Sequence, residues 1–551
     1  MHRVKTAVCR LLFVLFCLLP ALFFMNMDTF RTGDEIISYG MANEPEQGWM
    51  FSKGRIRSYM EENILRDGAA AVPGHLLESV GDVLKNRGDA AFFRTERPGE
   101  TGWYSGSELQ GYLKITPGEA FRMGDVYLNA MGDDANSFLY YTCLHLVSSI
   151  FPGISASKWS GFLLNLFCMA GCLLLMYRIS AFFIGQRSAR LVLLAAYACS
   201  AGALSMFTII RPYALAVVLQ EALLLVHLNM LQKLENCGRD VAKKDMKWLV
   251  LLYILGFTAH YTTGIWAVCL AAYTVCRSGR DRRFIRRYLL TGGLAVFLGI
   301  CIDPMSAVGL LSKRGTTESA GLPAVFAELL RALTHDLCTT VVFLLIPALI
   351  LLAALCRRIR SKDRGPDIKF LLFAALPFSY ILLSVLLMRV VKIRTMIPYL
   401  FILLGMLAIY ALGEKRRVKT ILGAFVLLLW LGGSFAGTAE DKMTEGRVNL
   451  LLEERMAMYG RDAMVFVRAH GAGYERIPLL GSFDRTYLLT TDEGWQEEIP
   501  ELLSAAEQSG LILFDEAEEA LSYIKECLKE EGKDTEILFT ETQCTLLRII
   551  G

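Results

Sequence analysis

The fold class that the sequence predicts is an α-helical polytopic membrane protein ending in a small α/β domain. Hydrophobic residues make up 54% of the 551 residues, charged residues make up 20%, and the mean hydropathy is +0.41. A soluble chain of this length rarely has such a composition. Long apolar segments recur as far as about residue 436, and strand-like and helix-like segments alternate after it.

Eleven apolar segments are candidate membrane spans, because about 20 apolar residues cross the hydrocarbon core of a bilayer. They are 7–25, 158–177, 188–204, 211–231, 248–259, 262–276, 288–304, 337–356, 368–388, 395–413 and 419–436. The segments 248–259 and 262–276 are short, and they predict a tight hairpin with thin or tilted arms.

The distribution of Lys and Arg predicts how these spans are oriented. The N-terminus is basic, and the surplus lies in four loops on the same side by parity. These loops hold five Lys/Arg in 232–247, six in 277–287, six in 357–369 and four in 414–419. We therefore expect a multi-pass protein of the cytoplasmic membrane with its N-terminus inside. The segments 26–157, 305–336 and 437–551 are then outside.

Two domains are expected, a membrane domain at 1–436 and an extracytoplasmic α/β domain at 437–551. The first apolar segment has no small-x-small cleavage site, so we expect it to stay as an anchor. Segment 137–150 is apolar but too short to span, and it predicts a re-entrant or interfacial helix. In the C-terminal domain, strands are expected at 463–468, 486–490, 511–514 and 536–550, and helices at 446–459, 494–508 and 516–530. Cys527 and Cys544 are both external and could form a disulfide.

The net charge of +3 gives no reason to expect a nucleic-acid partner, because the surplus lies in the cytoplasmic loops. The partner that the composition does predict is the lipid bilayer. The fourteen Cys are scattered mostly within spans, without metal-ligand spacing.

An acidic pair, Asp34 and Glu35, follows the first span in the segment TGDEIISYG. An Asp on the outer face beside the membrane can act as a general base if its neighbours tune its pKa. The alternative is a helix N-cap, since Asp34 opens an apolar stretch. A second acidic cluster, Asp133 and Asp134 with Asp125 ahead of it, ends the same loop. It could clamp a divalent cation or a sugar hydroxyl, or cap the helix that follows.

Basic and aromatic residues mark the outer face at three further places. Arg211 opens a span, and His260 with Tyr261 occupies the tip of the short hairpin, although a lone His at a helix end is more often structural. Parity also places 389–394, with Lys392 and Arg394, outside, against the positive-inside trend. A phosphate at the membrane surface would favour these cations, and snorkelling to lipid headgroups is the alternative.

The order of these motifs resembles that of bacterial GT-C glycosyltransferases of the family 39 type, which include protein mannosyltransferases and aminoarabinose transferases. The resemblance covers about residues 1–435 and rests on DEIISYG, LYYTCLHLVSSIFPG, RPYAL, HYTTG and IRTMIPYLF. It implies a GT-C fold and transfer of a hexose or pentose from a polyprenyl-phosphate donor to a glycan, lipid or protein at the outer membrane face. In such enzymes the first-loop Asp deprotonates or orients the acceptor, a role that falls on Asp34 with Glu35 beside it.

The sequence departs from the family at the end of the first loop. Many relatives have Asp-x-His-Pro-Pro-Leu-Tyr-Tyr there, whereas this chain runs from Asp134 through Asn136 to Tyr140 and Tyr141. Asn136 can form hydrogen bonds but cannot take a proton, so a role that needs the imidazole is in doubt. By motif position we assign substrate binding to Asp134, Asn136, Tyr140, Arg211, Tyr213, His260, Tyr261, Lys392 and Arg394.

Three hypotheses about function remain. A transporter or flippase would carry charges inside its spans, yet these interiors are almost free of charge apart from Glu221. A non-catalytic relative that binds a lipid-linked sugar is favoured by Asn136. The enzyme hypothesis expects one inverting displacement, in which Asp34 removes the acceptor proton. Arg394, Lys392 and Arg211 would then hold the leaving phosphate. The sequence leaves the need for a metal open.

Overall fold

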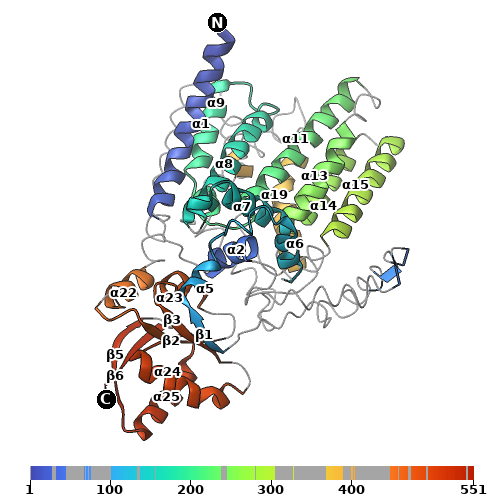
Figure 1. The fold of residues 1–551 in the computed structure, drawn as a ribbon. Coiled ribbons are helices and arrows are strands. Elements are labelled where there is room, and N and C mark those ends of the chain that lie inside the picture. The colour runs from blue at the N-terminus through green and yellow to red at the C-terminus, as the bar shows by residue number, and fades with distance from the viewer. Residues whose placement is uncertain are drawn as a thin grey trace.

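The structure is a computed structural model of the whole chain. It describes residues 2–27, 33–44, 101–132, 137–155, 157–237, 245–278, 281–303, 368–388, 447–456, 458–469, 473–491, 494–541 and 544–550, with a few isolated positions besides. Helices fill one end of the molecule, and a mixed sheet with its own helices fills the other (Figure 1).

Within the described residues, the helical part contains eight of the eleven apolar segments that the sequence predicts as spans. Its helices are α1 (His2–Met27), α8 (Lys158–Ser180), α9 (Arg187–Ala198), α10 (Ala201–Phe207), α11 (Tyr213–Cys237), α13 (Met246–Ala259), α14 (Thr262–Arg277), α15 (Arg282–Ile302) and α19 (Ile368–Met388). Side chains of preceding residues set two of the starts, because Ser157 caps α8 and Asp281 caps α15. Within the described residues, α8, α11 and α15 are long and apolar enough to cross a membrane, and α9 with α10 makes a fourth such unit.

The bend between α9 and α10 is 61° and falls in the span expected at 188–204. A new helix, α10, begins after Ser200 because the Ser200 hydroxyl caps it by accepting the Ala203 N–H. The short pair expected at 248–259 and 262–276 forms α13 and α14, with the break at His260. The spans expected at 337–356, 395–413 and 419–436 lie outside the described residues, apart from four positions around Tyr399. The count of eleven therefore stays a prediction.

The first loop forms short helices under the bundle. They are α2 (Gly33–Asn43), α5 (Gly106–Gly111), α6 (Met123–Gly132) and α7 (Phe138–Ile150), followed by the turn η3 (Pro152–Ile154). Helix α7 is the short apolar helix expected at 137–150. It is not confined to a surface, because Tyr140, Tyr141 and Leu144 are fully buried against its neighbours.

The C-terminal part is a six-stranded mixed sheet in the order β1-β3-β2-β4-β6-β5. Its strands are β1 (Gly102–Ser105), β2 (Ala463–Arg468), β3 (Arg485–Thr490), β4 (Leu511–Asp515), β5 (Asp534–Glu541) and β6 (Cys544–Ile550). Strand β2 pairs in parallel with β3 and β4, and the remaining pairs are antiparallel. The helical elements of this part are α22 (Arg447–Met456), η6 (Tyr474–Arg476), α23 (Ile477–Leu480), η7 (Trp495–Glu498), α24 (Ile499–Ser509) and α25 (Glu518–Glu530).

Two expectations for this domain were wrong. The continuous strand expected at 536–550 is a hairpin of β5 and β6, which break apart before Cys544. Cys527 and Cys544 are both free. They cannot meet, because Cys544 belongs to the apolar cluster on one face of the sheet and Cys527 packs against the cluster on the other.

Strand β1 comes from the first loop, so the sheet is built from both ends of the chain. Trp103 pairs with Tyr487, and Ser105 pairs with Arg485. Helix α5 follows at once through a capping box of Ser105 and Glu108. Gly106 donates its N–H to Asp484 O, and a Cβ at Gly106 would lie 2.0 Å from Phe483 O, so only glycine fits this contact. The loop and the C-terminal domain are therefore on the same side of the bundle.

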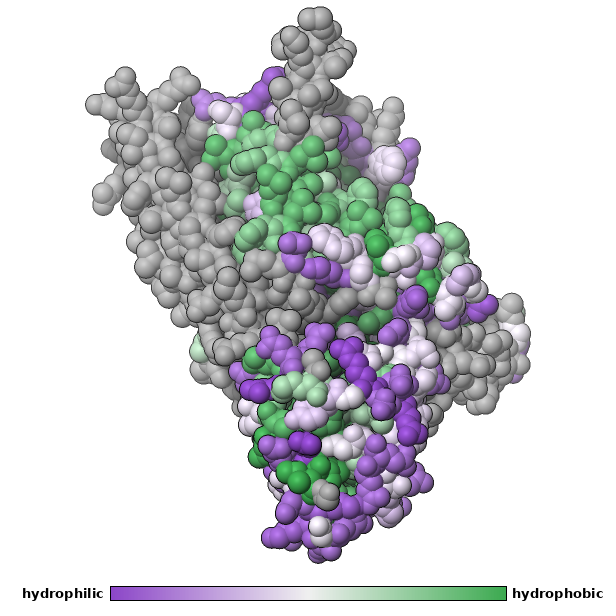
Figure 2. All heavy atoms as spheres, turned by 60° about the vertical axis from the view of Figure 1, so that its left-hand side comes forward, coloured by the Kyte–Doolittle hydropathy of each residue, from purple (hydrophilic) through white to green (hydrophobic). Residues whose placement is uncertain are grey.

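The two parts share one apolar core but have different surfaces. A single cluster of buried residues runs from the bundle through α2 and α5 to one face of the sheet, and α24 and α25 cover the other face. Figure 2 shows hydrophobic side chains gathered over the helical part and hydrophilic ones gathered over the C-terminal domain. This pattern is typical of a bundle surrounded by lipid and a domain surrounded by water.

Candidate functional site

The N-terminus of α2 presents the acidic pair. Helix α2 begins at Gly33, so Asp34 lies in its first turn and not at the capping position. The Asp34 side chain is 49% exposed, whereas Glu35 is 1% exposed. A carboxylate in the first turn is stabilised by the helix dipole. The two neighbours therefore have different environments, one open to solvent and one enclosed.

Asp34 forms an ion pair with Arg211. The Arg211 Nη2 lies 3.2 Å from Asp34 Oδ1, and its Nη1 donates to the Asp34 carbonyl at 3.4 Å. The arginine side chain is only 12% exposed. Two residues that the sequence predicts for the site, and that lie far apart in the chain, are thus brought into contact.

Glu35 fixes the segment that carries this arginine. Its Oε1 accepts the backbone N–H of Ile210 at 3.1 Å, one residue before Arg211. The enclosed Glu35 carboxylate thus contacts the backbone of the segment that leads into Arg211.

Helix α8 holds the same segment from the opposite side. Asn165 donates to Phe207 O at 3.0 Å and to Ile209 O at 2.7 Å, and it accepts the Tyr140 hydroxyl at 3.1 Å. Gly161 allows close packing there, because a Cβ would lie 2.5 Å from the Ile210 side chain. Tyr140 is fully buried. It supports the segment through its hydrogen bond to Asn165.

A further set of hydrogen bonds joins α2 to the start of α8. The Tyr39 hydroxyl donates to Ser157 O at 2.8 Å and accepts the Gly161 N–H at 3.1 Å. Ser160 also contacts this hydroxyl at 2.8 Å. Burial raises the pKa of Tyr39 well above its ordinary value. This neutral, fully bonded phenol locks the orientation of α2 and with it the position of Asp34.

Tyr213, His260 and Tyr261 form a buried aromatic stack. The His260 ring lies 5.4 Å from the Tyr213 ring and 4.3 Å from the Tyr261 ring, between centroids. His260 Nδ1 is also 2.8 Å from Thr262 Oγ1. The three side chains are 6–7% exposed. The stack ties the break between α13 and α14 to the start of α11, just after Arg211.

The C-terminal domain packs directly against the first residue of α2. A Cβ at Gly33 would lie 3.0 Å from Glu475 Oε2 in η6. The next residue, Arg476, donates its Nε–H to Asp515 Oδ2 at 2.6 Å. Burial raises the pKa of Asp515 to about 6, although the guanidinium of Arg476 acts in the opposite direction. This buried pair holds η6 in place beside α2.

Several predicted site residues lie outside the described part of the chain. They are Asp134, Asn136, Lys392 and Arg394. Asp125, which does lie within it, occupies the first turn of α6. The described residues contain no group of three or more His, Cys, Asp or Glu side chains that could hold a metal ion.

Sequence reasoning missed Asn165, Tyr39 and Ser160. A signal for Asn165 exists, because it is a polar residue in the middle of a predicted span, and such residues are costly unless they bond to a partner. Tyr39 lies within the DEIISYG motif, but the motif gave it no role of its own, and no comparable pattern marks Ser160.

The fold defines a class of protein, helical proteins with membrane-spanning helices and a C-terminal α/β domain. No protein-family model and no curated protein sequence matches the chain. Among solved structures, ArnT from Cupriavidus metallidurans in the apo state aligns over 98% of both chains, with a TM-score of 0.50 and 9% identity. The same ArnT bound to undecaprenyl phosphate aligns over 75% of this chain and 88% of the other, with a TM-score of 0.45 and 10% identity. The resemblance to the aminoarabinose transferases is thereby confirmed for the fold.

Proposed function

We propose that the protein is a membrane glycosyltransferase that moves a sugar from a polyprenyl-phosphate donor to an acceptor hydroxyl. The observation that carries this proposal is the Asp34–Arg211 pair. It sets an exposed carboxylate against a largely enclosed guanidinium, at the end of the bundle that the charge distribution assigns to the outer face. The donor class follows from the family resemblance. Undecaprenyl phosphate, which the ArnT comparison structure binds, belongs to the same class.

The reaction needs a base and a group that stabilises the leaving phosphate. The acceptor oxygen attacks the anomeric carbon while the bond from that carbon to the phosphate oxygen breaks, and polyprenyl phosphate leaves with the electron pair. Asp34 takes the acceptor proton. Arg211 stabilises the charge that develops on the leaving oxygen. On this proposal Lys392 and Arg394 add to the phosphate site, and Glu35 keeps Arg211 in position.

The ion pair also determines what the Asp34 carboxylate contacts when no substrate is bound. Before the substrate arrives, the Asp34 carboxylate contacts the Arg211 guanidinium. When donor phosphate binds, it competes for the same guanidinium and frees the carboxylate for the acceptor. Donor and acceptor binding are therefore expected to be ordered, with donor first.

The test is release of polyprenyl phosphate by the purified full chain, with hexosyl and pentosyl donors tried in turn. We expect Asp34→Asn to lower turnover by about 100-fold or more, the usual scale of general-base loss. The matched control is Asp484→Asn, which makes the same change at an exposed aspartate of the C-terminal domain and should keep turnover.

Two results would contradict the proposal. Near-normal turnover in Asp34→Asn would leave this residue a purely structural role. Donor binding without release by the unmodified chain would favour the non-catalytic relative.

A further inference from the structure

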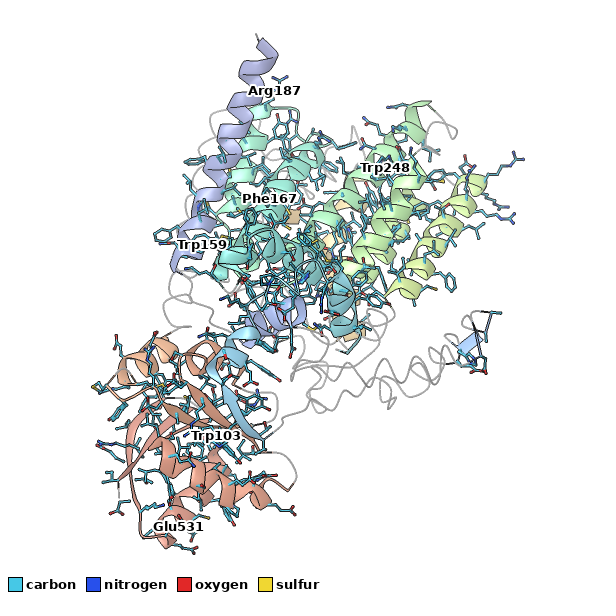
Figure 3. The ribbon with its side chains drawn as sticks, viewed as in Figure 1. Trp103, Trp159, Phe167, Arg187, Trp248 and Glu531 are labelled. Carbon is cyan, nitrogen blue, oxygen red and sulfur yellow. The ribbon has the colours of Figure 1, made fainter. Side chains whose placement is uncertain are left out.

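A pocket lies at the end of the bundle remote from α2. It has a volume of about 330 Å³ and lies between α8, α9 and α11, where Tyr177, Arg178, Phe182, Arg190, Leu225 and Asn229 line it. Arg187, the first residue of α9, marks this end in Figure 3, and Trp103 of the sheet lies at the other end. The pocket is thus separate from the Asp34 site, and its role does not depend on the proposed function.

The polar side chains that line the pocket are suited to binding an anion. The guanidinium of Arg190 lies 4.5 Å from the centre of the Tyr177 ring, and its Nε is buried without a hydrogen-bond partner. Arg178 is exposed in the last turn of α8. Among the described residues, neither arginine forms an ion pair with a carboxylate. Asn229 adds a neutral polar group at the wall.

The N-terminus of helix α9 adds to the positive electrostatic potential at the pocket. It begins beside the pocket at Arg187, and the Gln186 side chain makes no capping hydrogen bond. The positive end of the α9 dipole is therefore not neutralised by a side chain. The stack on Tyr177 also holds Arg190 in one orientation, so less side-chain freedom is lost when an anion binds.

An apolar stripe on α8 leads to the same arginines. Phe167 is 68% exposed and Leu174 is 55% exposed. They precede Arg178 by eleven and four residues, and these spacings place all three side chains on one face of the helix. Figure 3 shows Phe167 on α8 between Trp159 and the end of the bundle that carries Arg187. A hydrocarbon chain can lie along this face and end at the pocket.

We propose that this pocket binds the phosphate of an anionic phospholipid from the leaflet at that end of the bundle. The charge distribution predicts this leaflet to be the cytoplasmic one. Two guanidinium groups would bind the phosphate oxygens, and one acyl chain would lie along Phe167 and Leu174. A free phosphate could use the arginines but gains nothing from the stripe, so the apolar face is what favours a lipid.

The experiment is lipid binding to the full chain in mild detergent, counted by native mass spectrometry. Short-chain phosphatidylglycerol is the probe, and phosphatidylcholine of the same chain length is the neutral comparison. The unmodified chain should retain phosphatidylglycerol selectively. The double variant Arg178→Gln with Arg190→Gln should bind it about ten-fold or more weakly, since two charged hydrogen-bond partners are lost.

The matched control removes the same charge elsewhere at this end. Lys247→Gln with Arg282→Gln changes two exposed cations that do not line the pocket, and it should keep the selectivity. Equal loss in both double variants would reduce the effect to general charge and overturn the proposal. Millimolar inorganic phosphate that displaces the lipid completely would overturn the lipid assignment in favour of a phosphate site.

A single conservative variant covers the case in which the double variant does not fold. Arg190→Lys keeps the charge but loses the planar fork and much of the stack on Tyr177. We expect an intermediate loss of phosphatidylglycerol binding. Unchanged binding in Arg190→Lys together with Leu174→Asn would show that neither the fork nor the stripe contributes.

Discussion

At the scale of single residues, adjacent acidic side chains have opposite environments. Asp34 is half exposed and faces Arg211, whereas Glu35 is buried and bonds to the backbone of Ile210. Helical geometry causes this division, because successive residues point about 100° apart around the helix axis. The sequence predicts that the pair matters, but only the packing of α2 shows which member is accessible.

Glu35 gives a prediction that separates positioning from proton transfer. Glu35→Gln keeps an oxygen that can accept the Ile210 N–H, so turnover should fall little. Glu35→Ala leaves that buried N–H without its acceptor, at a cost of about 1–3 kcal/mol, and should loosen the segment that carries Arg211. The measurement is turnover together with donor KM. Were Glu35→Gln as damaging as Asp34→Asn, the carboxylate itself would have to take part in the chemistry.

Asp515 gives a pH dependence with a defined sign. Its folded-state pKa of about 6 lies above the ordinary value of 3.8, because burial outweighs the pairing with Arg476. The folded protein therefore holds this proton more tightly than the unfolded chain. Its contribution to stability is complete below about pH 4, decreases by about 3 kcal/mol as the pH rises to about 6, and is constant above that.

Hydrogen exchange of the β4 amides between pH 4 and 7, corrected for intrinsic rates, measures this decrease in the full chain. Asp515→Asn should lower the stability but remove this part of its pH dependence. Asp484→Asn, which changes an exposed carboxylate, should keep it. A slope in Asp515→Asn equal to that of the unmodified chain would assign the pH dependence to other groups.

At the scale of elements, the joint between α5 and the C-terminal domain contains Gly106, which leaves less room for an added Cβ than any other glycine in the described part of the chain. A methyl group at Gly106 would lie 2.0 Å from Phe483 O and 2.8 Å from Gly481 O. Both atoms are backbone, so they cannot turn aside as a flexible side chain would. The packing of β1 and α5 on the sheet therefore depends on this position.

Gly106→Ala should partly detach β1 from β3 and cost at least about 1–3 kcal/mol. Proteolysis of the native protein within 101–112 reports the detachment. Gly111→Ala is the matched control, because the same helix ends there and a Cβ would meet nothing within 4 Å. Equal protease resistance in the two variants would contradict a role for close packing at Gly106.

Elements with strong local patterns were the ones that the sequence predicted well. The apolar helices and the strands β2, β3 and β4 coincide closely with expectation, because their periodicity and composition set them. Strand β1 was missed, since four residues in a Gly-rich loop carry no signal without their partner β3. The break between β5 and β6 was missed because the apolar alternation continues across the turn.

The site residues divide in the same way, into those that a local sequence pattern marks and those that only the fold reveals. The sequence singles out Asp34, Arg211 and His260 because charged or polar residues next to apolar segments stand out, and their part in a site stays a prediction. Their mutual placement is not predicted, since it depends on Asn165, Gly161 and the packing of α2 on α8. Tyr140 illustrates the limit, because its motif predicts substrate binding, which stays a prediction, while only the fold reveals its hydrogen bond to Asn165.

At the scale of the whole molecule, the orientation in the membrane is a prediction that the architecture makes specific. The C-terminal domain and the first loop share one side, and the basic ends of α9 and α15 lie away from it (Figure 1). Glu531 and Arg187 are exposed residues at the two ends (Figure 3).

A cysteine in place of Glu531 should react with a membrane-impermeant maleimide in intact cells, and one in place of Arg187 should react only after permeabilisation. Labelling of the parent chain gives the background of its own cysteines. The reverse pattern would place the Asp34 site on the cytoplasmic face and contradict the proposed donor geometry.

The pairing of β1 with β3 also has a consequence for how the protein is made. A ribosome finishes residues 102–105 long before it begins 485–490, so on the predicted orientation the loop strand would wait beyond the membrane while the later helices are inserted. Until then neither edge of β1 is paired within this sheet, and β3 later pairs with one of them. A polypeptide that stops before β3 never forms the β1–β3 pair. Proteases could recognise such a polypeptide by its unpaired strand. A complete sheet would thus form only in a chain that has been fully synthesised and inserted.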